Sequence, residues 1–169
     1  QLSALLDVKR GINKKTKIIS DGGIKFSGDI VKALAAGADA VMVGSMLAGT
    51  SEAPGKIIKK KGKLFKVFRG MGSVGAMNKG SADRYFQKKQ KDKSKYVPEG
   101  VEGLIKYKGE VSKTINKLVG GLRSSMGYLG AEQIKNLNKK AKFVKITKAG
   151  FYESMVHSID EVKKNSEYL

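Results

Sequence analysis

The chain has 169 residues, a formal net charge of +19 and no cysteine. Its length suits one domain with its own hydrophobic core. Without cysteine, these residues contain no disulfide, no thiolate nucleophile and no thiolate metal site, and no stretch approaches the roughly 20 apolar residues of a membrane span.

The excess of positive charge raises the question of nucleic-acid binding. Arginine is the preferred residue for bidentate contacts with phosphates and bases. Only four of the 34 basic residues are arginines, namely Arg10, Arg69, Arg84 and Arg123. The lysines are spread along the chain rather than gathered on one element. We therefore expect neither a nucleic-acid partner nor a membrane partner.

Apolar runs and helical patterns alternate in the first third of the chain. An apolar face over residues 2–11 predicts a helix, and residues 17–20 read as a strand. A second helix is expected over residues 27–37 with Ser27 as its N-cap. Residues 40–43 follow as a second buried strand. This alternation predicts βα units and a parallel sheet, which is an α/β fold.

A glycine-containing loop follows each predicted strand. The first is Asp21-Gly22-Gly23-Ile24 and the second is Gly44-Ser45-Met46-Leu47-Ala48-Gly49-Thr50. Ligands of parallel sheets bind at the carboxyl ends of the strands. Glycines allow backbone N–H groups to approach a phosphate, while a carboxylate suits the donating hydroxyls of a sugar. The pattern favours a nucleoside monophosphate or sugar phosphate site, and a simple tight turn is the alternative.

The middle of the chain changes character. Residues 56–59 and 64–68 predict a β-hairpin around a lysine-rich turn with Gly62. Residues 69–98 are rich in glycine and then in charge, and a loop of this length is typical of a functional lid or a linker. Residues 99–108 are expected to form another strand pair.

The last third is predicted to be mainly helical. Apolar residues from Val111 to Leu122 indicate an amphipathic helix, in which Gly120-Gly121 is costly unless a backbone or a ligand comes close. Residues 131–138 predict a further short helix, and residues 143–146 a late strand. The tail from Thr147 is polar.

Five motifs stand in an order that resembles the inosine 5′-monophosphate (IMP) dehydrogenase family. Each is weak by itself, but the order and spacing are specific and cover essentially all of the chain. The motifs are Asp21-Gly22-Gly23-Ile24, Gly44 to Gly55, Arg69-Gly70-Met71-Gly72-Ser73, Asp83-Arg84-Tyr85-Phe86 and Gly120-Gly121-Leu122-Arg123-Ser124.

The resemblance implies a (β/α)8 TIM barrel, of which this chain supplies the C-terminal part as one domain. Residues 1–55 would form the last two βα units, residues 56–110 the hairpin and a mobile flap, and residues 111–169 the closing helix and tail. A full barrel needs roughly 250 residues. We expect the rest of the barrel, with the nucleophilic cysteine, to precede Gln1.

The resemblance also implies an activity, which is NAD-dependent oxidation of IMP to XMP in guanine nucleotide synthesis. A cysteine outside this chain would add to the purine, hydride would pass to NAD⁺, and the flap residues Arg84 and Tyr85 would activate water for hydrolysis. The enzyme is expected to be a cytoplasmic homotetramer that binds K⁺. This segment alone is expected to be inactive.

Site residues follow from the same resemblance. Asp21 would bind the ribose hydroxyls, the backbone of Met71 and Gly72 the purine edge, and Glu99 the ring near N1. The phosphate would lie on Gly23, Gly44 and Ser45. The other expected substrate-binding residues are Gly22, Phe68, Arg69 and Gly70. Carbonyls of Glu153, Ser154 and Met155 would bind a K⁺ ion held by the neighbouring subunit.

The sequence departs from the family pattern in two visible places besides its lack of cysteine. Phe68 stands where many members have a tyrosine that donates to the phosphate, and Ser154-Met155 replaces a Gly-Gly pair of some relatives. A GMP reductase-like enzyme and a non-catalytic basic binding fragment remain alternatives. From spacing alone, a surface pair of Arg84 with Asp83 is the stronger interpretation, and the family resemblance reverses this. His157 is expected to pack rather than to act as a base.

Overall fold

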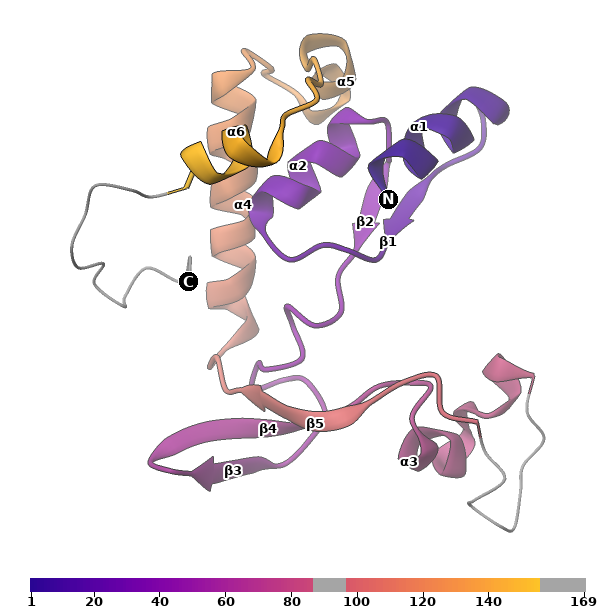
Figure 1. Cartoon of the computed structure of the whole chain (residues 1–169), viewed down its shortest axis with the longest axis vertical. Coiled ribbons are helices and arrows are strands. Elements are labelled where there is room, and N and C mark those ends of the chain that lie inside the picture. Colours follow the sequence, from indigo (N-terminus) through magenta and orange to yellow (C-terminus); the bar gives the residue numbers. More distant parts are fainter. Residues whose placement is uncertain (87–96, 156–169) are drawn as a thin grey trace.

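The structure is a computed structural model that describes residues 1–86 and 97–155. These residues form an upper and a lower lobe (Figure 1). In chain order, the upper lobe begins with α1 (Leu2–Gly11), β1 (Ile19–Asp21), α2 (Ser27–Ala35) and β2 (Ala40–Met42), and the lower lobe contains β3 (Ile57–Lys60), β4 (Lys63–Arg69) and β5 (Glu102–Lys106). The long helix α4 (Val111–Tyr128) rises from the lower lobe and packs against α2.

The upper lobe contains the predicted βαβ unit. Strands β1 and β2 pair in parallel, with Ile19 opposite Ala40 and Asp21 opposite Met42, and α2 connects them. The α/β character of the fold is therefore confirmed, with strands one residue shorter than expected. The closed barrel stays a prediction.

Asp39 holds the amino ends of these two strands together. Its carboxylate accepts a hydrogen bond from the Ile18 N–H at 3.0 Å and from the Lys17 ammonium at 2.9 Å. The hydrogen bond from Ile18 and the nearby charge of Lys17 hold the pKa of Asp39 below its usual value. The carboxylate therefore stays charged at neutral pH and keeps the register of the strands.

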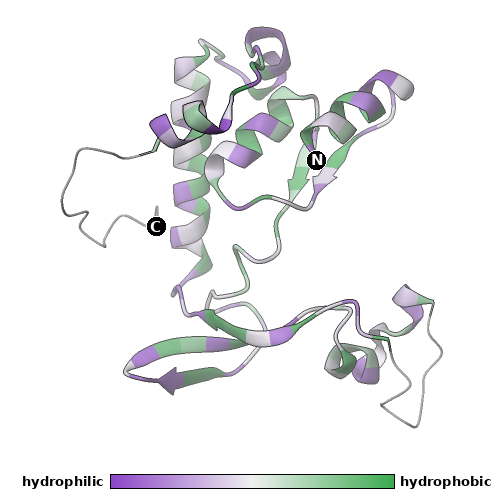
Figure 2. Ribbon diagram, viewed as in Figure 1, coloured by the Kyte–Doolittle hydropathy of each residue, from purple (hydrophilic) through white to green (hydrophobic). Residues whose placement is uncertain are grey.

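The main hydrophobic core lies between α2 and its neighbours. Helix α2 buries Ile30, Leu34 and Ala35, and these residues belong to one cluster with Leu118 of α4 and Leu137. Leu137 is completely buried. Figure 2 shows the apolar character of β1 and β2 beside this helix layer. The core thus fixes the βαβ unit against α4.

Helix α2 begins differently from the prediction. Phe26, not Ser27, occupies the N-cap position, and no side chain caps the helix from that residue. Instead, the carboxylate of Asp29 accepts hydrogen bonds from the N–H groups of Lys25 and Phe26, both at 3.1 Å. Partial burial would raise the pKa of Asp29, but these backbone hydrogen bonds and the charge of Lys32 outweigh it and lower the pKa.

The two adjacent glycines of α4 have different surroundings. A Cβ atom at Gly121 would overlap the side chain of Ser27, at the start of α2, whereas nothing lies within 4 Å of the same position at Gly120. A close approach therefore exists at Gly121, but it is made by a side chain and not by the backbone or ligand that the sequence predicted. The neighbouring turn is reinforced because the Ser125 hydroxyl donates to the Gly121 carbonyl at 2.9 Å.

This difference makes a matched pair of variants informative. Gly121→Ala is expected to lower the free energy of unfolding of the intact protein by about 1–3 kcal/mol, because α2 and α4 must move apart. Gly120→Ala should be neutral or stabilising by up to about 1 kcal/mol, since alanine is the better helix former. Denaturant titration of both variants measures the difference. Equal stability of the two variants would contradict the packing described here.

The lower lobe contains a three-stranded antiparallel sheet in the order β3-β4-β5. The predicted hairpin is confirmed, and its two-residue turn places Lys61 at φ 49° and Gly62 at φ 76°. Positive φ at both positions is typical of hairpin turns and explains the glycine. The strand pair expected over residues 99–108 is wrong. These residues contribute only β5, which pairs with β4 because that strand offers an unpaired edge.

Two other segments also differ from the prediction. Residues 74–85 are not a plain loop, since they form α3 (Val74–Ala76), a π-helical turn (Met77–Ser81) and a 3₁₀ turn (Asp83–Tyr85). The helix expected over residues 131–138 is a 3₁₀ turn (Ile134–Asn136) followed by α5 (Leu137–Lys140). Neither segment has the regular spacing of apolar residues that predicts a helix from sequence, so packing decides the form of both.

The late strand expected over residues 143–146 is absent from the described structure. The segment has no regular structure and is exposed, with Val144 81% accessible. After it, α6 (Lys148–Glu153) begins at Thr147, whose hydroxyl accepts a hydrogen bond from the Gly150 N–H. The tail therefore begins with a helix that the sequence reading missed.

Among the described helices, none combines the length and the apolar character that crossing a membrane requires.

Candidate nucleotide-binding site

The loop after β1 has the geometry expected of a phosphate or sugar loop. Gly22 and Gly23 adopt φ angles of 96° and 75°, which side chains other than glycine rarely adopt. The buried Ile24 anchors the end of the loop in the core. Asp21 is exposed, and the Gln1 amide donates to its backbone carbonyl at 2.7 Å. The Asp21 carboxylate is therefore available to a ligand.

The loop after β2 lies at the same edge of the sheet, because Asp21 and Met42 are paired. Gly44 and Ser45 are exposed at its beginning. The loop then turns tightly, since the Leu47 N–H donates to the Gly44 carbonyl at 3.0 Å. Both predicted loops thus meet at the carboxyl ends of the parallel strands.

The N–H groups of this edge are accessible to a ligand. Those of Gly23, Gly44 and Ser45 donate to no acceptor within residues 1–86 and 97–155. Backbone N–H groups with no partner in the protein are suited to phosphate oxygens. We call Asp21, Gly22, Gly23, Gly44 and Ser45 the strand-end cluster.

A second group of predicted residues lies in the lower lobe, where two backbone segments touch. The Gly70 N–H donates to the Val101 carbonyl at 2.9 Å, and the N–H groups of Glu99 and Gly100 donate to the Gly72 carbonyl at 2.9 and 3.0 Å. A Cβ at Gly72 would lie 3.1 Å from the Gly100 nitrogen. Glycine is needed here because no side chain fits between the segments.

These contacts bring Met71, Gly72 and Glu99 together, as the resemblance implies. Met71 is 49% exposed, and Glu99 is also exposed. The Met71 carbonyl accepts a hydrogen bond of 2.7 Å from the Ser81 hydroxyl, which orients the backbone of this segment. We call Met71, Gly72, Glu99 and Tyr85 the loop cluster.

Tyr85 belongs to the loop cluster because of where its ring lies. A Cβ at Gly72 would be 3.0 Å from Cζ of Tyr85, so the ring covers this glycine. Arg84 precedes it in an exposed 3₁₀ turn. The Arg84 backbone N–H, and not its guanidinium group, bonds the Asp83 carboxylate at 2.9 Å. The surface ion pair between the side chains of Arg84 and Asp83, which spacing alone suggested, is therefore not formed.

Arg69 has a partner that the sequence reading missed. Its guanidinium Nε lies 3.8 Å from the Glu102 carboxylate, and the register of β4 and β5 places the two residues opposite each other. The other oxygen of Glu102 accepts a hydrogen bond of 2.8 Å from the Gly75 N–H. Glu102 therefore joins Arg69 to the start of α3.

Phe68 is half-buried on β4, opposite Gly103. Its ring has no hydroxyl group, so it cannot supply the phosphate hydrogen bond of the family tyrosine. Apolar contact is the only contribution to a ligand that this side chain can make.

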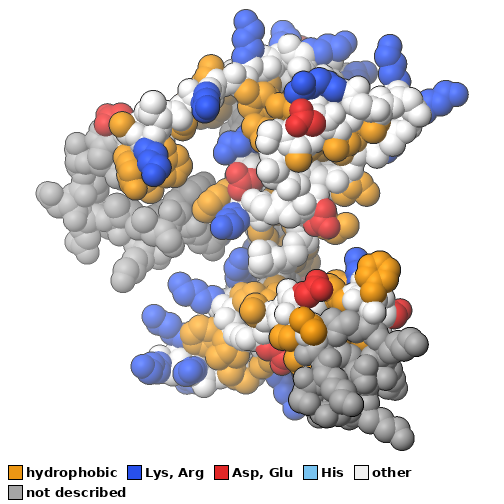
Figure 3. Space-filling view, turned by 45° about the vertical axis from the view of Figure 1, so that its right-hand side comes forward, with side chains coloured by type: hydrophobic (Ala, Val, Ile, Leu, Met, Phe, Trp, Pro, Cys, Tyr) orange, Lys and Arg blue, Asp and Glu red, His pale blue; other side chains and the backbone are white. Residues whose placement is uncertain are grey.

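The two clusters lie in different lobes of the described chain (Figure 1). On the face drawn in Figure 3, lysine and arginine side chains occur on both lobes and are interspersed with apolar and acidic ones. That face has no continuous basic stripe of the kind that tracks a nucleic-acid backbone.

The expected potassium ligands lie at the carboxyl end of α6. Glu153 is its last residue, and Ser154 and Met155 follow in an exposed turn. Carbonyls at the carboxyl end of a helix carry the negative end of its dipole. Such oxygens fit a hard cation, but three of them need further ligands from elsewhere. Within residues 1–86 and 97–155, no group of three His, Cys, Asp or Glu side chains could hold a metal ion.

Part of the predicted flap, over residues 87–96, lies outside the described residues, and so does His157. Nothing in the structure bears on either.

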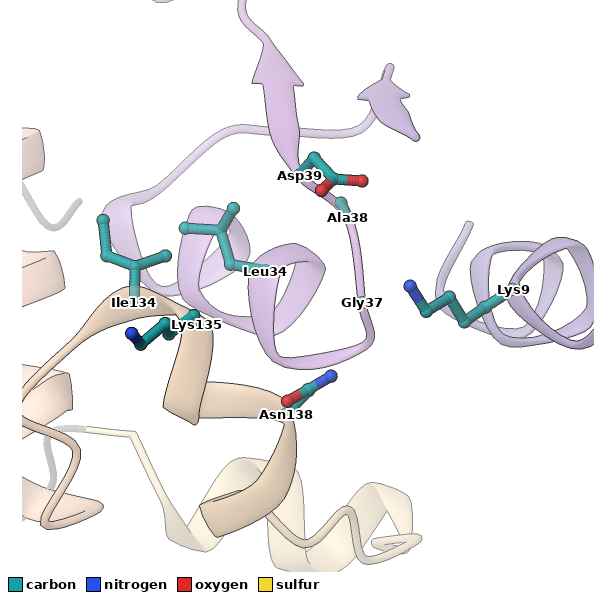
Figure 4. A pocket seen from close by; sticks show the side chains of 8 residues that line it. All are labelled: Lys9, Leu34, Gly37, Ala38, Asp39, Ile134, Lys135 and Asn138. Atoms are coloured by element: carbon teal, nitrogen blue, oxygen red, sulfur yellow. The ribbon is translucent and has the colours of Figure 1, made fainter. Parts of the chain in front are cut away.

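A cavity of about 320 Å³ opens elsewhere, at the amino end of β2 (Figure 4). Lys9, Leu34, Asp39, Ile134 and Asn138 are among its lining residues, and they come from three separate stretches of the chain. It lies at the opposite end of the strands from the strand-end cluster. Because ligands of parallel sheets bind at the carboxyl ends, we assign no function to this cavity.

A βαβ unit with two glycine loops at the carboxyl ends of its strands is typical of α/β proteins that bind phosphorylated ligands. The sequence matches a family model described as "IMP dehydrogenase / GMP reductase domain" over residues 1–157. The chain belongs to this family.

Similar proteins include three bacterial enzymes named inosine-5′-monophosphate dehydrogenase. The chain is 54% identical to that of Bacillus subtilis over 169 residues and 53% identical to that of Aquifex aeolicus over 170 residues, with 99% of this chain covered in each case. It is 55% identical to that of Helicobacter pylori over 151 residues, which cover 89% of this chain. The chain spans about a third of the length of these relatives, namely 34%, 34% and 31%.

Proposed function

We propose that this chain is the C-terminal part of the catalytic (β/α)8 barrel of an NAD-dependent IMP dehydrogenase. The complete enzyme would oxidise IMP to XMP in the guanine nucleotide synthesis of the cytoplasm. The observation that carries this proposal is the coincidence of two independent features. The strand-end cluster offers a carboxylate and N–H groups that have no partner among the described residues, and the loop cluster brings Gly72, Glu99 and Tyr85 together.

The strand-end cluster would bind the ribose phosphate of IMP. The Asp21 carboxylate can only accept hydrogen bonds, so it suits the ribose hydroxyls. The N–H groups of Gly23, Gly44 and Ser45 and the Ser45 hydroxyl would donate to the phosphate oxygens. Gly22 keeps the first loop in its positive-φ conformation. Together these groups would orient the nucleotide with its base toward the loop cluster.

The loop cluster would bind the purine. Backbone groups of Met71 and Gly72 would meet the edge of the ring, and Glu99 would lie near N1. Arg69 and Gly70 support this segment from β4, through the Glu102 ion pair and the hydrogen bond to Val101. Phe68 would offer only apolar contact near the phosphate.

Arg84 and Tyr85 would activate the water that hydrolyses the covalent intermediate. That intermediate forms on a cysteine, and this chain has none, so we place the nucleophile elsewhere in the enzyme. A guanidinium group is normally fully protonated, and it can accept a proton only in a desolvated pocket. Because Arg84 is exposed here, the segment must close over the purine before the arginine can act.

The proposal also includes two bound groups, NAD⁺ and K⁺. NAD⁺, when bound, accepts the hydride that leaves the purine. A K⁺ ion would be held by carbonyls of Glu153, Ser154 and Met155 together with a neighbouring subunit of a homotetramer, where it would stabilise the local backbone. Both assignments rest on the family and on the chemistry of these carbonyls at the end of α6.

A GMP reductase-like activity is the second candidate, since the family includes both enzymes. Reduction of GMP needs no hydrolysis of a covalent intermediate by water. The position of Tyr85 against Gly72, with Arg84 beside it, favours the dehydrogenase.

An assay of the intact enzyme separates the two activities. With IMP and NAD⁺, we expect stoichiometric XMP and NADH. The contrary result is consumption of NADPH with GMP and release of ammonia, without activity on IMP and NAD⁺.

A further inference from the structure

Lys66 is a buried lysine whose position neither the family motifs nor the proposed mechanism explains. It lies in the middle of β4 and is 2% exposed. Its ammonium group donates to the carbonyls of Thr50 at 2.9 Å, of Ser51 at 3.0 Å, and of Ala53. An ammonium group has three protons, and all three are used.

This arrangement is unusual because burying a charge is costly unless it is hydrogen-bonded. Here the cost is offset by three backbone acceptors, all from one short segment. The segment of residues 50–53 begins at Thr50, the last residue of the second glycine loop. Lys66 therefore fastens that loop to the central strand of the lower sheet.

The connection extends back to the proposed phosphate site. Thr50 is 1% exposed, and its hydroxyl donates to the Leu47 carbonyl at 2.8 Å. The Leu47 N–H in turn donates to the Gly44 carbonyl at 3.0 Å. A continuous series of hydrogen bonds thus runs from the Lys66 ammonium to Gly44, which is one of the expected phosphate ligands.

Further contacts hold the same loop on the sheet. The Lys108 N–H donates to the Gly49 carbonyl at 2.8 Å, and a Cβ at Gly49 would overlap the carbonyl of Lys106. The Glu52 carboxylate accepts a hydrogen bond of 2.9 Å from the Val111 N–H at the start of α4. The Lys108 ammonium also donates to the Met46 carbonyl at 3.2 Å, and Lys66 holds the loop from β4.

In the other direction, β4 leads straight into the loop cluster. Arg69 is the last residue of the strand, and Gly70, Met71 and Gly72 follow it. Arg69 is fixed opposite Glu102 of β5. A shift of Lys66 along the strand would therefore move the segment that is proposed to meet the purine.

We infer that Lys66 is a positioning residue, which sets the distance between the phosphate loop and the purine-binding segment by fastening residues 50–53 to β4. The inference rests on the proposed function for the identity of the ligand. The fastening itself is visible in the contacts of Lys66. Lys66 touches no reacting atom in this role, so it acts through Gly44 and Gly72.

The test compares Lys66→Met with Lys63→Met in the intact enzyme. Methionine keeps most of the apolar stem but leaves the three carbonyls without their donor. Lys63 lies on the same strand and is exposed, so its replacement removes an equal charge at the surface. The readouts are the dissociation constants for IMP and inosine, and hydrogen exchange of the amides of residues 44–53 and 70–73.

In Lys66→Met, the preference for IMP over inosine is expected to fall at least tenfold, and both segments should exchange faster. Lys63→Met should match the parent in both measurements. Lys66→Arg, which keeps a donating cation, should recover part of the IMP preference. A merely destabilised variant would instead have fewer active molecules with unchanged affinities, and that result would overturn the inference.

Two further outcomes keep the inference separate from the proposed function. If the parent does not prefer IMP to inosine, the proposed function fails, and exchange decides whether Lys66 fastens the loop. Unchanged exchange of residues 44–53 in Lys66→Met would overturn the inference whatever the ligand. Should Lys66→Met not fold, Lys66→Gln, which retains two N–H donors, is measured in the same way against Lys63→Gln.

Discussion

Replacing Arg84 by alanine in the intact enzyme is expected to produce a burst of NADH followed by a much slower steady state. In the proposed mechanism, hydride transfer does not need the arginine, because the segment that carries it would close over the purine only after that step. Hydrolysis of the covalent intermediate would lose its proposed base, and general-base catalysis typically contributes about 10²–10⁴-fold. Rapid-mixing measurement of NADH absorbance resolves the two phases.

The matched control for this variant is Lys79→Ala. Lys79 lies in the preceding π-helical turn and is exposed, so its replacement removes a nearby positive charge without touching the loop cluster. It should leave the burst and the steady state unchanged. If Arg84→Ala lowers both phases by the same factor, Arg84 acts in binding or folding, and its assignment as the base is wrong.

Asp21→Ala should weaken the binding of IMP and of inosine by similar factors. Both ligands carry the ribose hydroxyls that the carboxylate is proposed to accept. Hydrogen bonds to charged groups contribute about 1.5–3 kcal/mol, which corresponds to roughly 10- to 150-fold in the dissociation constant. Within residues 1–86 and 97–155 the Asp21 carboxylate takes part in no hydrogen bond or ion pair, and the Gln1 amide bonds Asp21 only at its backbone carbonyl, so the substitution should leave the fold intact. Calorimetric titration of both ligands measures the effect.

Ser45→Ala provides the complementary control. It should weaken IMP by about 1 kcal/mol, the contribution of one ordinary hydrogen bond, and leave inosine unaffected. The pair of variants thus separates the ribose contact from the phosphate contact. An Asp21→Ala enzyme with unchanged affinity for both ligands would remove Asp21 from the site.

The local fold of the chain could be predicted where hydrophobic pattern and turn chemistry agree. The βαβ unit follows from two apolar strands around an amphipathic helix, and the hairpin follows from Gly62 in its turn. The strand expected over residues 143–146 was wrong because residues with high β propensity form a strand only when they can pair with another strand. The second strand expected within residues 99–108 was wrong because β4 already offered an edge to β5.

The candidate site was predictable to the extent that glycines mark it. Glycine is required by the positive φ angles of Gly22 and Gly23 and by the close backbone contact at Gly72. Such positions are visible in the sequence as glycine motifs. Long-range side-chain contacts were not predictable. Glu102 and Lys66 find their partners only when the strands pair and the second loop folds onto them.

The central claim is that the strand-end cluster and the loop cluster bind opposite ends of one nucleotide. A crystal structure of the intact enzyme with IMP tests it most directly. We expect the phosphate on the N–H groups of Gly23, Gly44 and Ser45, the ribose hydroxyls on Asp21, and the purine edge on the backbone of Gly72. IMP bound to one cluster alone, with the other facing solvent or another subunit, would contradict the account.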